Sequence, residues 1–329
     1  MIIDDLVTLG QIQTAAETLR GITTVTPLVP FGPAAARTWL KAESLQPIGA
    51  FKLRGAYVAI ASLDAEARAR GVITYSSGNH AQGVARAARL LDAPAVVVMP
   101  DDAPAIKVER VRADGAEVVV VGPASDERQQ RAEAIAADRG LAIIPPYDDD
   151  RIIAGQGTIG LEILADRPST DLVLVPIGGG GLASGVATAV KALRPTARIV
   201  GIEPELAADA RDSLARGTIV RWSAEDVART IADGTRTQSL GRRTFVHLQA
   251  RLDGIITVSE DEIAAGVRLA AEQSRLVAEP SGALVVAALA FHAEALGLDR
   301  VAGDVVGVVS GGNVDPGRYR AYLETPLPG

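Results

Sequence analysis

The sequence is informative first for what it lacks: none of its 329 residues is cysteine, and only three are histidine. Zero cysteine excludes disulfides, cysteine nucleophiles and cysteine-ligated metals, and three histidines argue against a multi-histidine zinc site. No apolar run reaches the roughly 18 residues of a membrane span. The first five residues, Met1 to Asp5, lack the basic start and long apolar core of a signal peptide. We therefore expect a cytoplasmic protein with no membrane partner.

The sequence also has a modest net charge and few aromatic residues. The formal net charge of −7 is modest, which argues against nucleic acid as a main partner. Only 3% of the residues are aromatic, whereas 48% are hydrophobic, so the core must consist mainly of Ala, Val, Ile and Leu. A chain of 329 residues exceeds one ordinary core, and we expect two domains or one large α/β unit.

Short apolar runs alternate with helical patterns from about residue 71 onwards. Because these runs are continuously apolar, we expect strands buried on both faces, in parallel sheets covered by helices. The expected strands are 72–75, 95–99, 117–121, 141–144, 171–177, 198–202, 254–258 and 304–309. The expected helices are about 11–19, 81–91, 127–138, 182–193, 260–276 and 283–296, with Ser259 and Glu262 as a capping box. Two α/β layers, roughly 71–147 and 150–329, would then enclose a ligand cleft near Pro145 and Pro146.

Lysine is scarce as well. Among 33 basic residues the only lysines are Lys41, Lys52, Lys107 and Lys191. Lys52 lies in an apolar stretch, residues 45–56, that is rich in Gly, Ala and Phe. An amine can lose its proton and attack a carbonyl once burial or a neighbouring cation lowers its pKa, which Arg cannot do. Lys52 is therefore a candidate nucleophile or base; the alternative is a stem packed on apolar surface with its ammonium in water.

Four consecutive glycines, Gly178 to Gly181, follow an expected strand and precede an expected helix that starts at Leu182. Successive N–H groups without a Cβ, at a helix N-terminus, form an anion cradle suited to phosphate. The same loop satisfies G-x-G-x-x-A, with Glu203 about twenty residues on, which is the fingerprint of an NAD-dependent dehydrogenase. Gly155, Gly157 and Gly160 match a similar pattern without a convincing strand before it, so the fingerprint alone is weak.

Two polar clusters also follow expected strands. The turn from Ser76 to His80 offers N–H donors and a hydroxyl at a helix start, which suits a carboxylate, although Ser and Asn are also ordinary N-cap residues. Ser310 to Asn313 follows the last expected strand. Serine at that position is either a turn residue or a hydroxyl directed into the cleft.

With Lys52, these motifs resemble, in this order, the fold-type II pyridoxal-phosphate (PLP) enzymes, specifically the serine/threonine dehydratase and serine racemase family. The resembling segments are 46–56, 76–83, 155–158, 178–182 and 310–313, within a span from about Thr26 to Asp315. The resemblance implies a two-domain α/β fold with the active site in the interdomain cleft. Residues 1–60 and 150–329 would form a discontinuous large PLP-binding domain, and residues 61–149 a small α/β domain. A dehydrogenase becomes a distant alternative.

The resemblance implies a role for each motif. Lys52 would form an imine with the cofactor aldehyde, and Phe51 would lie against the ring. Asn79 would hydrogen-bond the ring 3-oxygen, and Ser310 would meet the ring nitrogen. A hydroxyl there leaves the nitrogen largely unprotonated and the ring a weaker electron sink, which favours prompt β-elimination. The phosphate would bind the backbone N–H groups of Gly178, Gly179, Gly180, Gly181 and Leu182.

The implied activity is the removal of water and ammonia from L-threonine- or L-serine-type β-hydroxy amino acids to give a 2-oxo acid and ammonia. Freed Lys52 would remove the α-proton. The substrate carboxylate would bind the segment formed by Ser76, Ser77, Gly78, Asn79 and His80. In the racemase branch a serine in the position of Ser77 faces the lysine across the cofactor, so serine racemase is an alternative.

Two departures from the family pattern leave the substrate open. Ala50 stands where relatives often carry Ser, and Tyr147 where some racemases have a smaller polar residue. Both lie near the expected pocket, so 3-hydroxyaspartate or a bulkier β-hydroxy amino acid is a further alternative substrate. The sequence ends soon after Asp315, and we expect neither a regulatory domain nor control by isoleucine. A third reading is a non-catalytic amino-acid-binding relative, for which Lys52 would be dispensable.

A divalent-cation site and a homodimer are implied as well. Glu203, the Ala207 carbonyl and Asp209 match the cation site of the racemase branch. Carboxylate and carbonyl oxygens suit Mg²⁺ or Ca²⁺. The alternative is a set of ordinary surface charges, because Glu205 is also nearby.

Overall fold

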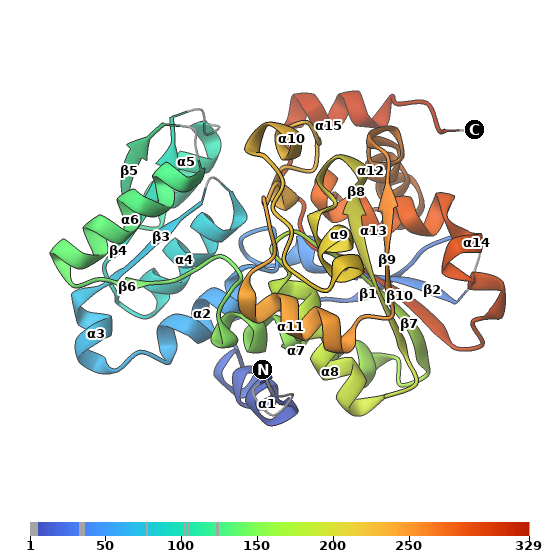
Figure 1. Ribbon diagram of the computed structural model, residues 1–329, viewed down its shortest axis with the longest axis horizontal. Helices are drawn as coiled ribbons and strands as arrows, with labels where there is room; N and C mark the ends of the chain where they lie inside the picture. The colour runs from blue at the N-terminus through green and yellow to red at the C-terminus, as the bar shows by residue number, and fades with distance from the viewer. Residues whose placement is uncertain are drawn as a thin grey trace.

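The structure is a computed structural model that describes residues 6–32, 37–76, 78–101, 103, 105–122 and 125–328. It contains two sheets flanked by helices, which confirms the α/β fold class and the mostly parallel pairing (Figure 1). Within the described residues, no helix is both long and apolar enough to span a bilayer.

The larger sheet has six strands in the order β1-β2-β10-β7-β8-β9. Their bounds are β1 Leu28–Pro30, β2 Thr38–Ala42, β7 Thr170–Pro176, β8 Arg198–Pro204, β9 Gly254–Val258 and β10 Asp304–Val309. Only β1 is antiparallel to its neighbour. Alternate residues of β7 enter two different cores: Leu172 and Leu174 one, Val173 and Val175 the other. Both faces are buried, which is why the sequence of this strand is continuously apolar.

Helices cover both faces of this sheet. They are α7 (Asp150–Asp166), α8 (Gly181–Leu193), α12 (Glu260–Ser274) and α13 (Pro280–Phe291). Residues of α12 and α13 fill one core and residues of α7 and α8 the other. The capping box of Ser259 and Glu262 is confirmed at the start of α12.

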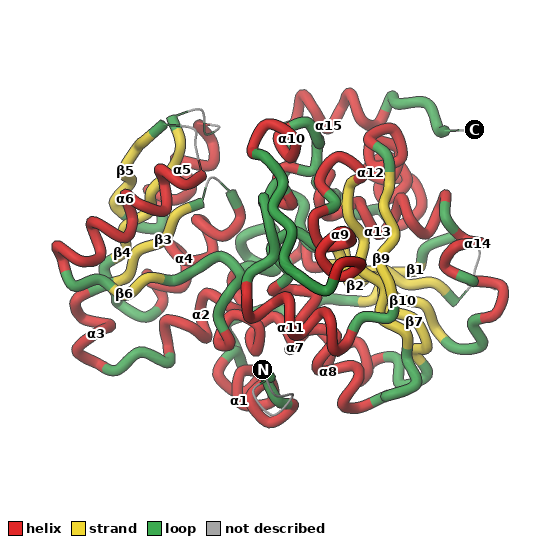
Figure 2. The backbone as a smooth tube through the Cα atoms, viewed as in Figure 1, coloured by secondary structure: helices red, strands yellow, loops and turns green. Residues whose placement is uncertain are grey.

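The smaller sheet has four parallel strands in the order β5-β4-β3-β6. Its strands are β3 Val72–Tyr75, β4 Ala95–Pro100, β5 Glu117–Val121 and β6 Ala142–Ile143. Its helices are α2 Leu53–Ala61, α3 Ala65–Arg70, α4 Asn79–Leu90, α5 Ala105–Ala113 and α6 Ser125–Arg139. Figure 2 shows the strands as two separate groups, and this one uses only residues between 72 and 143. The division into domains at 60/61 and 149/150 stays a prediction.

The remaining α-helices of the described residues are α1 Leu9–Thr18, α9 Asp209–Arg216, α10 Ala224–Ala228, α11 Arg242–Arg251, α14 Ala293–Leu296 and α15 Pro316–Leu323. Two expected helices end early. The helix expected over 260–276 stops at Ser274 because Arg275 is left-handed, with φ of 59°. The helix expected over 283–296 is interrupted at His292, so α13 and α14 are separate.

Three glycines that matched the dinucleotide pattern lie inside α7. Gly155, Gly157 and Gly160 are buried where α7 packs against α2, α1 and α8. A Cβ at Gly155 would lie 2.6 Å from the Gly55 Cα, and one at Gly160 would lie 2.8 Å from the Ala189 Cβ. These glycines therefore allow close helix packing, and they do not form a nucleotide-binding loop.

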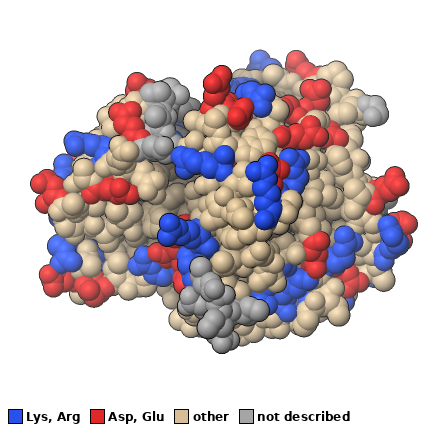
Figure 3. All heavy atoms as spheres, viewed as in Figure 1, with Lys and Arg blue, Asp and Glu red and all other residues tan. Residues whose placement is uncertain are grey.

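Figure 3 shows acidic and basic side chains interspersed on the face that it presents.

Candidate active site

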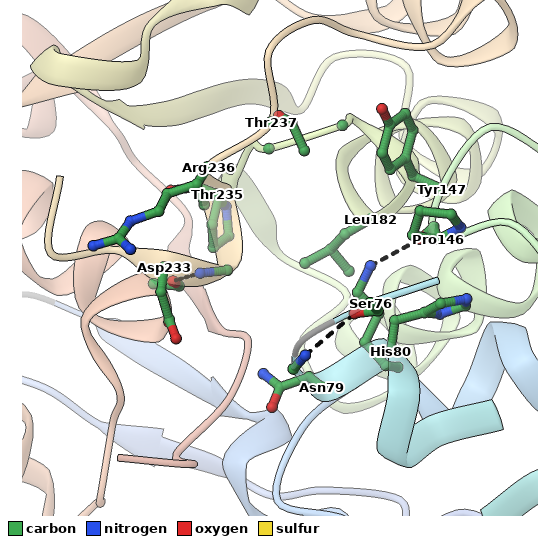
Figure 4. Close-up of a pocket in the computed structure, with 18 of the residues that line it drawn as sticks. Ser76, Asn79, His80, Pro146, Tyr147, Leu182, Asp233, Thr235, Arg236 and Thr237 are labelled. Atoms are coloured by element: carbon green, nitrogen blue, oxygen red, sulfur yellow. Dashed lines mark hydrogen bonds between the residues drawn. The ribbon is translucent and has the colours of Figure 1, made fainter. Parts of the chain in front are cut away.

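A cavity of about 240 Å³ lies between the two sheets and is lined by residues from both (Figure 4). The segments that follow β3, β7 and β10 supply Ser76, Gly178 and Ser310 to its wall. The carboxyl ends of parallel strands are the usual place for a ligand in α/β folds. The expected cleft between two α/β layers is thus confirmed.

Lys52 directly precedes α2, and its side chain lines this cavity. Its Nζ donates a hydrogen bond to the Pro146 carbonyl at 2.8 Å and lies 5.1 Å from the centroid of the Phe51 ring. Burial lowers the pKa of Lys52 to about 8. A far larger fraction of this amine is therefore neutral at physiological pH than for an ordinary lysine, as a nucleophile or base requires.

The tetraglycine loop connects β7 to α8 on the same cavity. Gly180 has φ of +92°, a left-handed conformation that favours glycine. A Cβ at Gly179 would overlap the Tyr147 ring, so no side chain fits at this position of the loop. Thr244 Oγ1 donates to the Gly179 carbonyl at 2.7 Å and fixes the loop on α11. The loop leaves a bare N-terminal turn of α8 as a cradle for an anion.

The turn after β3 forms the opposite wall. Gly78 N–H donates to Ser76 Oγ at 3.2 Å, and Asn79 begins α4. The imidazole of His80 is buried, with Nε2 3.0 Å from the Ile144 carbonyl. Burial and then the nearby charge of Lys52 lower the pKa of His80 to about 3, so this ring is neutral. Ser77 lies outside the described residues.

Ser310 is buried at the end of β10, also on the cavity wall. Its carbonyl accepts the backbone N–H of Phe51 at 3.0 Å, and its Oγ lies 3.5 Å from the Ser281 carbonyl. The structure thus brings the lysine stretch, the Ser76 turn, the glycine loop and the Ser310 turn onto one cavity. Segments that are 258 positions apart in the chain, at 52 and 310, share its wall.

Three charged residues of this cavity were not predicted from the sequence. Glu279 is buried, and burial followed by the charge of Asp233 raises its pKa to about 8. Lys107 on α5 forms an ion pair of 2.8 Å with Asp233, which joins the two sides of the cleft. The scarcity of lysine was a signal that could have drawn attention to Lys107, whereas nothing in the local sequence distinguishes Glu279.

The three residues expected to hold a cation are grouped at the start of α9. Glu203 and Asp209 are fully buried, and Ala207 is buried in the turn between them. Both Glu203 oxygens accept backbone N–H groups, from Ala210 at 3.0 Å and Arg211 at 2.8 Å. Neither Asp209 oxygen has a hydrogen-bond partner among the described residues.

Both carboxylates have raised pKa values. Burial, and then the charge of Asp209, raises the pKa of Glu203 well above its usual range. Burial raises the pKa of Asp209 to about 7, although the backbone N–H groups of Asp209 and Leu240, which lie nearby without a well-formed hydrogen bond to its carboxylate, oppose the change. A buried carboxylate without a partner is unfavourable unless a proton or a cation neutralises it.

Residues 19–311 match the protein family described as pyridoxal-phosphate dependent enzymes. The chain belongs to this family. It is 42% identical, over 88% of this chain and 86% of the relative, to the L-threo-3-hydroxyaspartate ammonia-lyase of Saccharomyces cerevisiae. It is 38% identical, over 97% of this chain and 99% of the relative, to the serine racemase of Schizosaccharomyces pombe.

A solved crystal structure of a threonine deaminase from T.th. superimposes with a TM-score of 0.85 and 43% identity, over 94% of this chain and 99% of that chain. The family resemblance expected from the motifs is therefore confirmed, and the chain is an enzyme with PLP as its cofactor. The dehydrogenase alternative is set aside. In addition, the Glu203 carboxylate is occupied by α9 backbone amides, so it does not reach out to a ribose.

The residues in the cavity fit PLP. A scarce amine with a lowered pKa, a glycine cradle at a helix N-terminus and a buried hydroxyl at a strand end face one space. An aldehyde, a phosphate and a ring nitrogen need these three partners.

Proposed function

We propose that the protein is a PLP-dependent ammonia-lyase that removes water and ammonia from L-threonine- or L-serine-type β-hydroxy amino acids. One observation carries the proposal: the Lys52 amine and the glycine loop that would hold the phosphate lie on the same cavity as the Ser76–His80 turn. Relatives named for L-threo-3-hydroxyaspartate and L-threonine ammonia-lyase activity, at 42% and 40% identity, support β-elimination as the reaction class.

Each group is assigned the role that the family resemblance implies for it. The backbone N–H groups of Gly178 to Leu182 would hold the phosphate, Asn79 would hydrogen-bond the ring 3-oxygen and Ser310 would meet the ring nitrogen. Bound PLP supplies an electron sink for the electron pair left at the substrate α-carbon. The turn from Ser76 to His80 would bind the substrate carboxylate, with the N–H groups of Asn79 and His80 at the start of α4 among its donors. The neutral form of Lys52, favoured by burial, accepts the α-proton.

Two neighbours of Lys52 support this role. The Pro146 carbonyl orients the amine toward the cavity, and the neutral ring of His80 adds no competing positive charge. Because His80 Nε2 faces the Ile144 carbonyl, we propose that His80 contributes to carboxylate binding through its backbone N–H and not its ring.

The proposed activity is tested with L- and D-isomers of serine, threonine and threo-3-hydroxyaspartate. Formation of 2-oxo acid and ammonia is measured for each isomer, together with the enantiomer composition of the remaining substrate. Turnover of at least one L-isomer that is lost in Lys52→Ala supports the proposal. Full turnover or ligand response in Lys52→Ala would favour a non-catalytic amino-acid-binding relative.

Racemisation is the second candidate activity, supported by the 38% identical serine racemase and by the serine at position 77. In this candidate, Ser77 exchanges a proton on the face of the substrate opposite Lys52. Ser77→Ala should then retain elimination from the L-isomer while inversion collapses. Persistent inversion in this variant contradicts the assigned role.

We also propose that Glu203, the Ala207 carbonyl and Asp209 bind Mg²⁺ or Ca²⁺. The buried Asp209 oxygens without a partner among the described residues support this site, because a divalent cation would neutralise them. Chelator should lower the thermal unfolding temperature of the holoenzyme, and added cation should restore it. Asp209→Asn should lose this response, whereas Asp299→Asn at an exposed site should keep it. An equal response in both variants contradicts the site.

Two further expectations accompany the proposal. A homodimer would be detected by light scattering coupled to gel filtration. Location in the cytoplasm would be tested by cell fractionation.

A further inference from the structure

Asn313 was part of a sequence motif, but the proposed chemistry gives it no role. In the structure its side chain is the centre of a hydrogen-bond chain that crosses the cleft. Arg110 on α5 donates from Nη1 to Asn313 Oδ1 at 2.8 Å. Asn313 Nδ2 donates to Asn79 Oδ1 at 2.9 Å, and Asn79 Nδ2 donates to Glu279 Oε1 at 2.6 Å. All three bonds point in one direction, from the Arg110 guanidinium to the Glu279 carboxyl group.

This direction fixes which way the Asn79 amide faces. A reversed amide would place its NH₂ group against the NH₂ group of Asn313 and its oxygen against the Glu279 carboxyl oxygen. The contact with Asn313 would lose its hydrogen bond in a partly buried site, which costs about 1–3 kcal/mol. The Asn313 amide is fixed in the same way, because its Nδ2 also donates to the Ile48 carbonyl at 2.8 Å.

The backbone leaves room for this chain at two glycines. A Cβ at Gly49 would lie 2.5 Å from Asn313 Oδ1, and one at Gly311 would overlap the Glu279 carboxyl. Gly49 also has φ of +72°, where other residues are strained. The close approach of backbone to both partners indicates that the amide and the carboxyl occupy built positions.

The amide of Asn79 has two N–H bonds and only one goes to Glu279. Among the described residues no partner takes the second, and Asn79 lines the cavity (Figure 4). We propose that Asn313 and Glu279 are positioning residues that hold this second N–H toward the 3-oxygen of the cofactor ring. This inference rests on the proposed function, which assigns Asn79 to that oxygen.

The chain also joins both sides of the cleft. Arg110 and Asn79 lie on helices α5 and α4 beside the smaller sheet. Asn313 follows β10 of the larger sheet, and Glu279 directly precedes α13. The orientation of Asn79 therefore depends on the two layers being closed against each other. Opening the cleft would separate the amide from both partners at once.

The test compares PLP binding to the apo protein and the absorption of the bound cofactor in several variants. A donor at the 3-oxygen stabilises its ionised form, so losing it should lower the visible band relative to the near-ultraviolet band. Asn313→Asp keeps the shape and accepts from Arg110, but it presents an oxygen to Asn79 Oδ1. We expect about tenfold weaker PLP binding and a lower visible band, as in Asn79→Ala.

Two further variants separate positioning from folding. Glu279→Gln keeps an acceptor for Asn79 and should retain the wild-type band ratio. Arg110→Ala removes only the exposed end of the chain and should shift the ratio in the same direction as Asn313→Asp, by less. The matched control is Arg112→Ala on the exposed surface of α5, which should shift nothing.

The outcomes are distinguishable from failure of the proposed function. If Asn313→Asp and Arg110→Ala keep the wild-type ratio and affinity while Asn79→Ala changes them, the positioning role is overturned. If Asn79→Ala also behaves as wild type, the inference is overturned although Lys52 can still capture PLP. If the wild-type protein captures no PLP, the proposed function fails with it.

Discussion

Arg54 follows Lys52 by two residues and is the centre of a buried ion network under the cleft. It is 1% exposed and donates to Glu43 through Nε and Nη2, both at 2.8 Å. It also donates to Glu162 at 2.6 Å, and Lys41 Nζ lies 2.6 Å from the same carboxylate. The network ties α2, which begins next to Lys52, to α7 and to the end of β2.

Replacing Arg54 by Met should destabilise the protein by about 3–5 kcal/mol, because it leaves a buried carboxylate without its cation. Glu43 is fully buried, so water cannot replace the guanidinium. The matched control is Arg70→Met, whose pair with Glu66 is exposed at 45% and 86% and should be worth less than about 1 kcal/mol. The free energy of unfolding in urea measures both.

The dependence of this loss on pH tests its cause. In the wild type, burial would raise the pKa of Glu43, but the charge and hydrogen bonds of Arg54 outweigh burial and leave the pKa lowered. The stability from this pair is therefore present above the unfolded pKa and is lost as the pH falls through the folded one. In Arg54→Met burial is opposed by the weaker effects of the Lys41 charge and the Thr26 hydrogen bond, so the pKa of Glu43 rises and the penalty fades as the carboxyl is protonated.

The difference in the free energy of unfolding between Arg54→Met and the wild type should consequently decrease as the pH falls from neutral to about pH 4. A loss below about 1 kcal/mol at neutral pH, or a gap that stays constant on acidification, would refute the argument from the buried charge.

Three other perturbations have outcomes fixed by the structure. The rate at which apo protein captures added PLP should rise with pH through about 8, because the neutral Lys52 amine is the nucleophile. A rate that does not change between about pH 7 and pH 9 would contradict this. Gly180→Ala places a Cβ 2.9 Å from the Thr244 Cβ at a residue with positive φ. The affinity for PLP should therefore fall at least about tenfold in titrations, while the circular dichroism spectrum stays unchanged. Wild-type affinity would contradict phosphate binding by the glycine loop. Gly155→Ala should lower the free energy of unfolding in urea by about 1–3 kcal/mol, because its Cβ would clash with α2. Gly254→Ala, where a Cβ would meet open space, should leave this free energy unchanged.

The sequence predicted several strands well because their residues form continuously apolar runs. The bounds expected for 117–121, 254–258 and 304–309 coincide with β5, β9 and β10. A continuously apolar run flanked by turns has few other stable solutions in a chain of this length. The motif residues that follow β3, β7 and β10 line one cavity.

Long-range contacts could not be predicted in this way. The contact of Asn79 with Glu279 joins residues 200 positions apart, and neither neighbourhood indicates the other. Helix α7 was not predicted because its three glycines imitate a loop, although they serve close packing. The break at His292 was missed for the opposite reason, since apolar periodicity continues across it.

The central claim is that Lys52 binds the cofactor covalently, and the four lysines of the chain make a direct test possible. The protein is incubated with PLP, reduced with borohydride and digested, and mass spectrometry locates the phosphopyridoxyl group. The account predicts stoichiometric modification of the peptide containing Lys52. Modification at Lys41, Lys107 or Lys191 in its place, or at no lysine, would contradict it.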